Sequence, residues 1–241
     1  MWLLYLLSCS LFYYNDPDMS QIEMTTVGNN WNVGVQRSTR SSLKITVLTD
    51  DEELGHGSGN LFEYQDELFV VTAAHVVSDN LNYVLKEGNG NIVSCRIIYL
   101  NKEKDVAILK PYGEFTITLA SKYINNNSGH MIGKDLHYTG YPGNLHHVYL
   151  KGYVSQYNDE MIIMNSFAWP GASGSSVFDS AGRVVGVVSA VLLTYDHYRG
   201  DYATIPQIVI VNRLSFLSRK TIREALMNEK RRIENWNLNQ R

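Results

Sequence analysis

From Ser41 onward, the sequence is a succession of short β-favouring runs separated by clusters of turn-forming residues. The first half contains SLKITVL, GSGNLFEY, ELFVVTAAHVV, NYVLKE, IVSCRIIYL and DVAILKP, and the second half contains DLHYTGY, HHVYLKGYVSQY, EMIIMN, SSVFD, VVGVVSAVLL and QIVIVNRL. Short strands separated by residues such as Asp50-Asp51 and Gly88-Asn89-Gly90 are typical of β-barrels and β-sandwiches. Because strands do not alternate with helical segments, the pattern excludes an α/β fold.

A polar stretch divides these runs into two sets. Its centre, NNNSG at residues 125–129, has the composition of a loop, and about six runs lie on each side of it. We therefore expect an all-β fold of two packed six-stranded antiparallel barrels, at residues 41–120 and 135–217. An inter-barrel linker at residues 121–134 would join them.

Residues 1–40 have a different composition, an apolar leader followed by an extended polar arm. The leader, WLLYLLSCSLFYY at residues 2–14, is too short to span a bilayer and lacks the basic start of a secretory signal. The leader could direct export or contact a membrane. Alternatively, it could pack on one of the barrels. The sequence thus leaves the location undecided between a secreted or membrane-tethered protein and a soluble intracellular one. Cys9 lies in the leader and Cys95 in a strand-like run, so no disulfide between them is expected.

The tail at residues 218–241 is expected to form one amphipathic helix. Thr221 and Glu224 have capping-box spacing. Four apolar residues fall near one helical face: Ile222, Leu226, Ile233 and Trp236. We expect that face to dock on the second barrel.

Three segments carry residues suited to catalysis, in the order histidine, aspartate, serine. The apolar run VVTAA ends in His75, Asp105 leads directly into the run VAILK, and Ser173 lies in the glycine-flanked loop GASG. A serine hydroxyl needs a neighbouring base, a histidine can supply one near neutral pH, and a carboxylate can orient that histidine. Each segment alone is more often structural, but their order is that of chymotrypsin and differs from that of α/β-hydrolases and subtilisins.

On these residues the chain resembles the trypsin-like serine peptidases of the chymotrypsin fold. It is most similar to disulfide-free members such as HtrA-type proteases, bacterial glutamyl endopeptidases and related viral enzymes. The matching pieces are GSGNLF at residues 57–62, VVTAAHVV at 70–77, DVAILK at 105–110, TGYPGN at 139–144, KGYVS at 151–155, GASGSSVF at 171–178 and GRVVGVVSA at 182–190.

The resemblance implies a role for each matched residue. His75 would be the general base, Asp105 its orienting acid and Ser173 the nucleophile. Gly171 and Ser173 would supply the N–H groups of the oxyanion hole, and Ser189 would present backbone to an extended substrate. Phe167, Ala168, Ser189, Ala190 and Val191 would line an uncharged primary pocket suited to small or medium apolar side chains.

The expected function is therefore that of a serine endopeptidase acting on a protein or polyprotein bound as an extended strand. We expect no cofactor and no metal, because no His/Cys cluster has zinc spacing. A nucleic-acid partner is not expected at a formal net charge of -3. A catalytically silent barrel that binds protein is the alternative. Because Ala172 cannot pair with a new N-terminus, no trypsin-type zymogen switch is expected and residues 1–40 would be dispensable for activity. The natural substrate and the oligomeric state cannot be derived from the sequence.

Overall fold

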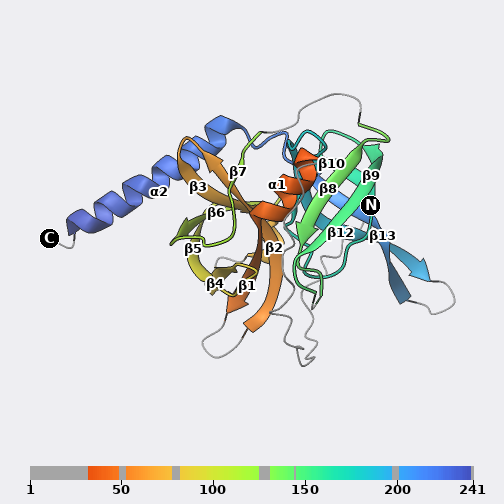
Figure 1. Ribbon diagram of the computed structural model, residues 1–241, viewed down its shortest axis with the longest axis horizontal. Coiled ribbons are helices and arrows are strands. Elements are labelled where there is room, and N and C mark those ends of the chain that lie inside the picture. Colours follow the sequence, from red (N-terminus) through yellow and green to blue (C-terminus); the bar gives the residue numbers. More distant parts are fainter. Residues whose placement is uncertain are drawn as a thin grey trace.

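A computed structural model of the chain describes residues 32–48, 53–77, 82–124, 131–143, 145–196 and 201–239 (Figure 1). The expected leader at residues 2–14, Cys9 and the arm up to residue 31 lie outside the described residues. Among the helices that are described, none has the length and apolar character needed to cross a membrane.

The first barrel is a closed ring of six antiparallel strands. Its order is β1-β4-β5-β6-β3-β2, and the pairing of β1 with β2 closes it. A short strand, β7, adds to β2 in parallel outside the ring. The strands are β1 (Ser42–Leu48), β2 (Glu53–Tyr64), β3 (Glu67–Thr72), β4 (Asn82–Lys86), β5 (Ile92–Asn101), β6 (Val106–Tyr112) and β7 (Ser121–Lys122), with a single 3-10 turn, η1 (Ala74–Val76), after β3.

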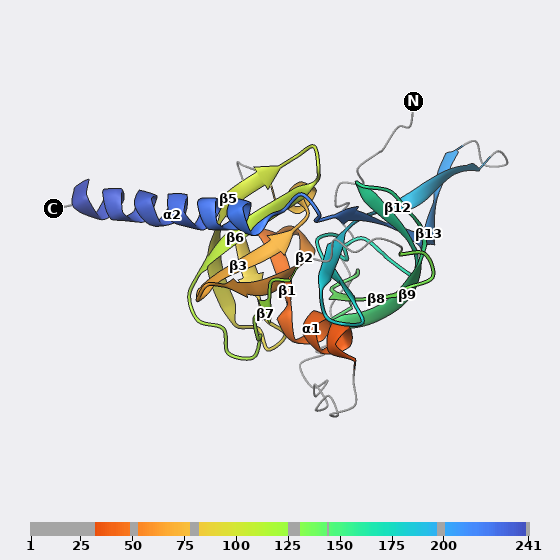
Figure 2. The same ribbon diagram turned by 90° about the horizontal axis from the view of Figure 1, so that it is seen from above.

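The second barrel is also closed, in the order β10-β13-β12-β11-β8-β9. Its strands are β8 (Asp135–Gly140), β9 (Val148–Tyr157), β10 (Met161–Asn165), β11 (Ser176–Asp179), β12 (Val184–Asp196) and β13 (Asp201–Arg213). The prediction of two six-stranded antiparallel barrels is thus confirmed. The hairpin of β12 and β13 is longer than expected, and its end extends beyond the barrel (Figure 2).

The two barrels meet through a buried aromatic cluster. Phe62 of β2 stacks on Phe178 of β11 with ring centroids 5.9 Å apart, and Tyr123 packs edge-on against Phe62 at 5.5 Å. Each barrel has a further apolar core of its own. Because the interface is built from large buried rings, it fixes the relative position of the strands that carry the site described below.

The N-terminal arm was expected to be extended up to residue 40, and this is wrong for its last part. Val33–Ser41 forms a helix, α1, that packs against β8 and β11. The side chain of Asn32 caps it by accepting the N–H groups of Gly34 and Val35 at 2.8 and 3.2 Å. The helix was missed because its buried face consists of Gly34, Ser38 and Ser41 rather than of apolar residues.

The C-terminal helix, α2 (Arg219–Asn239), is present as predicted, but its cap and its docking differ from expectation. Ser218 rather than Thr221 caps it, since the Ser218 hydroxyl accepts the N–H of Thr221 at 3.1 Å. The helix runs along the first barrel rather than the second (Figure 1). The hydroxyl of Tyr112, at the end of β6, donates to the buried carboxylate of Glu229, and this contact holds the middle of the helix.

Candidate active site

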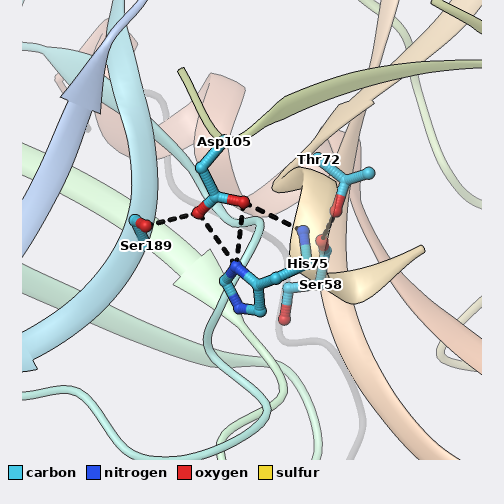
Figure 3. A network of polar contacts seen from close by, with 5 residues as sticks. All are labelled: Ser58, Thr72, His75, Asp105 and Ser189. Atoms are coloured by element: carbon cyan, nitrogen blue, oxygen red, sulfur yellow. Dashed lines mark hydrogen bonds and ion pairs between the residues drawn. The ribbon is translucent and has the colours of Figure 1, made fainter. Parts of the chain in front are cut away.

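His75 and Asp105 form a hydrogen-bonded pair at the first barrel's edge facing the second (Figure 3). His75 lies in the turn η1 directly after β3, and Asp105 directly precedes β6, which pairs with β3. The Nδ1 of His75 lies 3.0 and 2.9 Å from the two carboxylate oxygens of Asp105. A carboxylate only accepts hydrogen bonds, so Nδ1 carries the proton and Nε2 is left as the acceptor.

The carboxylate of Asp105 is held by several donors at once. It accepts the backbone N–H of His75 at 2.9 Å and the hydroxyl of Ser189 from β12. Burial alone would raise the pKa of Asp105, but the hydrogen bonds and charge of His75, with the bond from Ser189, hold that pKa below its ordinary value. The backbone of Asp105 has a φ of 50°, a left-handed conformation that Asp tolerates better than most residues.

The glycine-flanked loop presents one serine and hides the others. Ser173 is half-buried, whereas Ser175 and Ser176 are 0% exposed and cannot reach a substrate. Gly174 has a φ of 90°, and a Cβ there would collide with the carbonyl of Ser58 and the hydroxyl of Thr72. A side chain at this position would therefore push the loop away from the strand that leads to His75.

Hydrogen bonds within and beside the loop orient the two N–H groups expected to form the oxyanion hole. The carbonyl of Pro170 accepts from the N–H of Gly143 at 2.6 Å, and the carbonyl of Ala172 accepts from the N–H of Ser175 at 3.1 Å. In a trans peptide the N–H points opposite to the carbonyl, so the N–H groups of Gly171 and Ser173 point away from these bonds. Among the described residues neither N–H has an acceptor, as an oxyanion site requires.

Ser58, to which the sequence pattern assigned no role, is hydrogen-bonded to several parts of the candidate site. Its hydroxyl donates to the carbonyl of Gly171 at 2.7 Å and accepts the N–H of Tyr141 at 2.9 Å. Its N–H donates to the carbonyl of Ser173 at 2.8 Å, and its own carbonyl accepts the hydroxyl of Thr72 at 2.7 Å. The strand β2 thus connects the loop of Ser173 to β3, which ends before His75, and Figure 3 shows the bond from Thr72 to Ser58.

The structure brings all three proposed triad residues to the same junction between the barrels. A Cβ at Gly57 would lie 3.1 Å from the carbonyl oxygen of Ser173 and 2.5 Å from Val76, the neighbour of His75. Among the described residues, the side chains of His75 and Ser173 make no hydrogen bond to each other. In enzymes without substrate this bond is often long and tightens in the complex.

The residues expected to line the primary pocket differ in how deeply they are buried. Ala168 is 3% exposed and packs in the core of the second barrel, while Ala190 and Val191 are half-buried on β12. The ring of Phe167 is 41% exposed and stacks parallel to that of Trp169, with centroids 6.4 Å apart. Trp169 was not anticipated as a site residue, although it precedes the expected oxyanion-hole glycine by two positions in WPGAS.

Comparisons with known proteins agree with this geometry. A family model of the trypsin-like peptidase domain matches residues 57–187. A serine protease HtrA-like protein from Staphylococcus aureus (strain bovine RF122 / ET3-1) is 26% identical in an alignment over 201 residues that covers 73% of this chain and 26% of that protein. The chain therefore spans about a quarter of the length of this curated relative. The crystal structure of the serine endoprotease from Yersinia pestis has the same fold, with a TM-score of 0.62 at 19% identity, over 85% of this chain and 69% of that one.

Proposed function

The chain belongs to the trypsin-like peptidase family, and we propose that it is a serine endopeptidase that cleaves peptide bonds through an acyl-enzyme on Ser173. The observation that carries this proposal is the pair of His75 and Asp105. The carboxylate holds Nδ1 of the imidazole, so Nε2 faces away from it as a base. Ser173 is the loop serine that is open to a substrate, and it lies at the same junction.

The proposed reaction has two halves. Nε2 of His75 takes the proton of the Ser173 hydroxyl while its oxygen attacks the scissile carbonyl carbon, and the N–H groups of Gly171 and Ser173 stabilise the negative oxygen. The bond from carbon to the leaving nitrogen then breaks, and His75 donates the proton to that amine. A water molecule, deprotonated by the same imidazole, attacks the ester and releases Ser173 with its proton restored.

The free edge of β12 supports binding of an extended substrate. The strand β11 pairs with Val184–Val187 only, and the last contacts on that side are those of Val188 with Gly174 and Ser175. From Ser189 onward, no described strand pairs with this edge of β12. A substrate strand can therefore add its backbone hydrogen bonds there, beside the nucleophile.

The pocket residues support a preference for a small or medium apolar side chain before the scissile bond. None of Phe167, Ala168, Ala190 and Val191 carries a charge, so a Lys, Arg or Glu side chain would lose its hydration without gaining an ionic partner. The exposed rings of Phe167 and Trp169 add apolar surface at the same place.

A fluorophosphonate probe tests the function directly. We expect the purified protein to react with the probe and to hydrolyse casein, and Ser173→Ala to abolish both, with a loss of about 10⁴- to 10⁶-fold in turnover. Ser175→Ala is the matched control, because its hydroxyl is buried and outside the proton path. A protein that binds peptides but neither reacts with the probe nor cleaves casein would instead be a catalytically silent binding module.

A further inference from the structure

The helix α1 is attached to the second barrel through polar contacts rather than through apolar packing. The Nδ2 of Asn32 lies 2.9 Å from Nε2 of the buried His137, and Arg37 donates to the carbonyl of Gly182 at 2.7 Å. Gly34 lies so close to β11 that a Cβ would collide with the carbonyl of Asp179. These contacts fix the N-terminal end of α1 in one position on the second barrel.

The other end of α1 is connected to the nucleophile loop by one buried amide, that of Asn60 on β2. Its Nδ2 donates to the hydroxyl of Ser41 at 2.9 Å and to the carbonyl of Ser38 at 3.2 Å, and both acceptors belong to α1. Its Oδ1 accepts the backbone N–H of Ser176 at 2.7 Å. Asn60, Ser38, Ser41 and Ser176 are all 0% exposed, so water cannot replace these partners without rearrangement.

The peptide between Ser175 and Ser176 is consequently held at both ends. Its N–H donates to Asn60, and its carbonyl accepts the N–H of Val188 at 2.9 Å. The preceding N–H, of Ser175, is the donor that orients the carbonyl of Ala172 and therefore the N–H of Ser173. A shift of the Asn60 side chain would be transmitted through two peptides to the oxyanion hole.

We propose that the docked helix α1 acts as a clamp, which holds the nucleophile loop (residues 171–177) in its active conformation. Asn60 is the positioning residue that connects α1 to this loop. When α1 is docked, Ser38 and Ser41 fix both N–H groups of the amide, and its oxygen is aimed at Ser176. When α1 shifts, the buried amide loses its acceptors and turns to find others, which releases the Ser176 N–H. This inference rests on the proposed peptidase function, and it assigns to α1 a control over the rate of the chemical step.

The decisive variant is Gly34→Ala, which moves α1 without touching the site. The added methyl group must displace α1 from the carbonyl of Asp179, at the end of the helix remote from Asn60. We expect kcat to fall by about 10- to 100-fold, because small misplacements of catalytic groups have effects of that size. KM should stay close to the wild-type value, since the β12 edge is unchanged. Arg40→Ala is the control on the same helix, because that side chain is exposed.

Asn60→Ala removes the connection itself, and it should reproduce the loss of kcat with α1 in place. All kinetics are measured at a temperature at which thermal melting shows every variant to be folded, so that a general loss of stability does not count. If Asn60→Ala does not fold, Ser41→Ala, which removes one acceptor of the amide, replaces it with a smaller expected loss. Folded Gly34→Ala and Asn60→Ala proteins with the kcat of Arg40→Ala would overturn the proposal.

Amide hydrogen exchange provides a readout that does not depend on activity. In Gly34→Ala we expect faster exchange in the segment at residues 171–177, with unchanged exchange in β5 and β6 of the first barrel. If the wild-type protein neither cleaves peptides nor reacts with a fluorophosphonate, the proposed function is wrong. Hydrogen exchange at residues 171–177 then remains the test of whether α1 holds this loop. Unchanged exchange at residues 171–177 in Gly34→Ala would show that α1 is only a packing element.

Discussion

The hydroxyl of Ser58 donates a hydrogen bond of 2.7 Å to the carbonyl of Gly171, so a strand of the first barrel supports the second-barrel loop that carries the proposed nucleophile, Ser173. A site shared between two barrels needs hydrogen bonds from one barrel to the other, because each barrel carries only some of the candidate catalytic residues. His75 and Asp105 come from the first barrel and Ser173 from the second. Ser58, Asn60 and the aromatic interface hold the two parts in register.

Replacement of Ser58 by Ala should weaken both the fold and the site. It leaves the carbonyl of Gly171 and the N–H of Tyr141 buried without this partner, which destabilises a protein by about 1–3 kcal/mol. We expect a lower midpoint in urea unfolding and a lower kcat. Thr46→Val is the control, because the Thr46 hydroxyl is buried and has no hydrogen-bond partner in the part of the chain that the structure describes. A Ser58→Ala protein as stable and as active as Thr46→Val would contradict the role assigned to Ser58.

The bond from Ser189 to Asp105 should be visible in the pH dependence of activity. The Ser189 hydroxyl is one of the groups that lower the pKa of Asp105, so Ser189→Ala raises that pKa. Asp105 must be ionised to orient His75, so the part of the low-pH loss of activity that comes from protonation of Asp105 should begin at a higher pH than in the wild type. Loss of one hydrogen bond to a charged group predicts a roughly tenfold lower kcat at neutral pH. The measurement is kcat against pH, and unchanged profiles would refute the prediction.

The sequence predicted the fold class and the barrel strands because period-two runs and turn residues are local signals. It also indicated a candidate triad, which stays a prediction, since the order and the flanking residues of His75, Asp105 and Ser173 can be recognised along the chain. It did not reveal α1 or the role of Asn60. Their contacts join polar residues far apart in the sequence, and a buried polar face has the composition of a loop. The docking of α2 on the first barrel depends on contacts between residues far apart in the sequence, which no local pattern predicts. Ile222 and Leu226 pack in the buried cluster that contains Phe62, and the hydroxyl of Tyr112 donates to Glu229.

Two truncated chains can distinguish the role of the arm from the role of the helix α1 that follows it. Ala172 is 0% exposed, and its methyl side chain cannot pair with a newly cut N-terminus, so activity without a trypsin-type zymogen switch stays a prediction. A chain starting at residue 32 keeps the cap of α1 and should retain the wild-type kcat. A chain starting at residue 42 lacks α1 and should lose most activity, which replaces the earlier expectation that residues 1–40 are all dispensable. Equal activity of the two truncated chains would exclude a role for α1.

The specificity prediction can be tested on a denatured proteome. The proposed uncharged pocket predicts cleavage after Ala, Val or Leu, and the preference should be broad because one methylene changes selectivity by only about 10- to 200-fold. Trp169→Ala removes apolar surface beside Phe167 and should lower kcat/KM most for the larger of these side chains. Mass spectrometry of the products gives the residue before each cut. Predominant cleavage after Lys, Arg or Glu would show that a charged group reaches the pocket.

A buried carboxylate outside the site organises the loop between β6 and β7. Glu87, at the end of β4, is 4% exposed and accepts the N–H groups of Thr116, Ile117 and Thr118 at 2.7, 2.9 and 2.6 Å. Burial alone would raise the pKa of Glu87, but these bonds and that from Asn91 lower it to about 2. A depression of this size corresponds to about 3 kcal/mol of stability at neutral pH.

The folded pKa of Glu87 lies below its value of 4.5 in the unfolded chain, so its stabilisation is complete above pH 4.5 and is lost as the pH falls toward about 2. Glu87→Gln keeps the shape but removes the charge that three N–H groups approach. We expect this variant to be less stable at pH 7 and to lose less stability than the wild type between pH 5 and pH 3. Glu67→Gln is the control, because Glu67 is 47% exposed in its ion pair with Lys110. The measurement is the free energy of unfolding in urea at each pH across this range. Parallel dependence of this free energy on pH in the wild type and Glu87→Gln would show that the carboxylate does not anchor the loop.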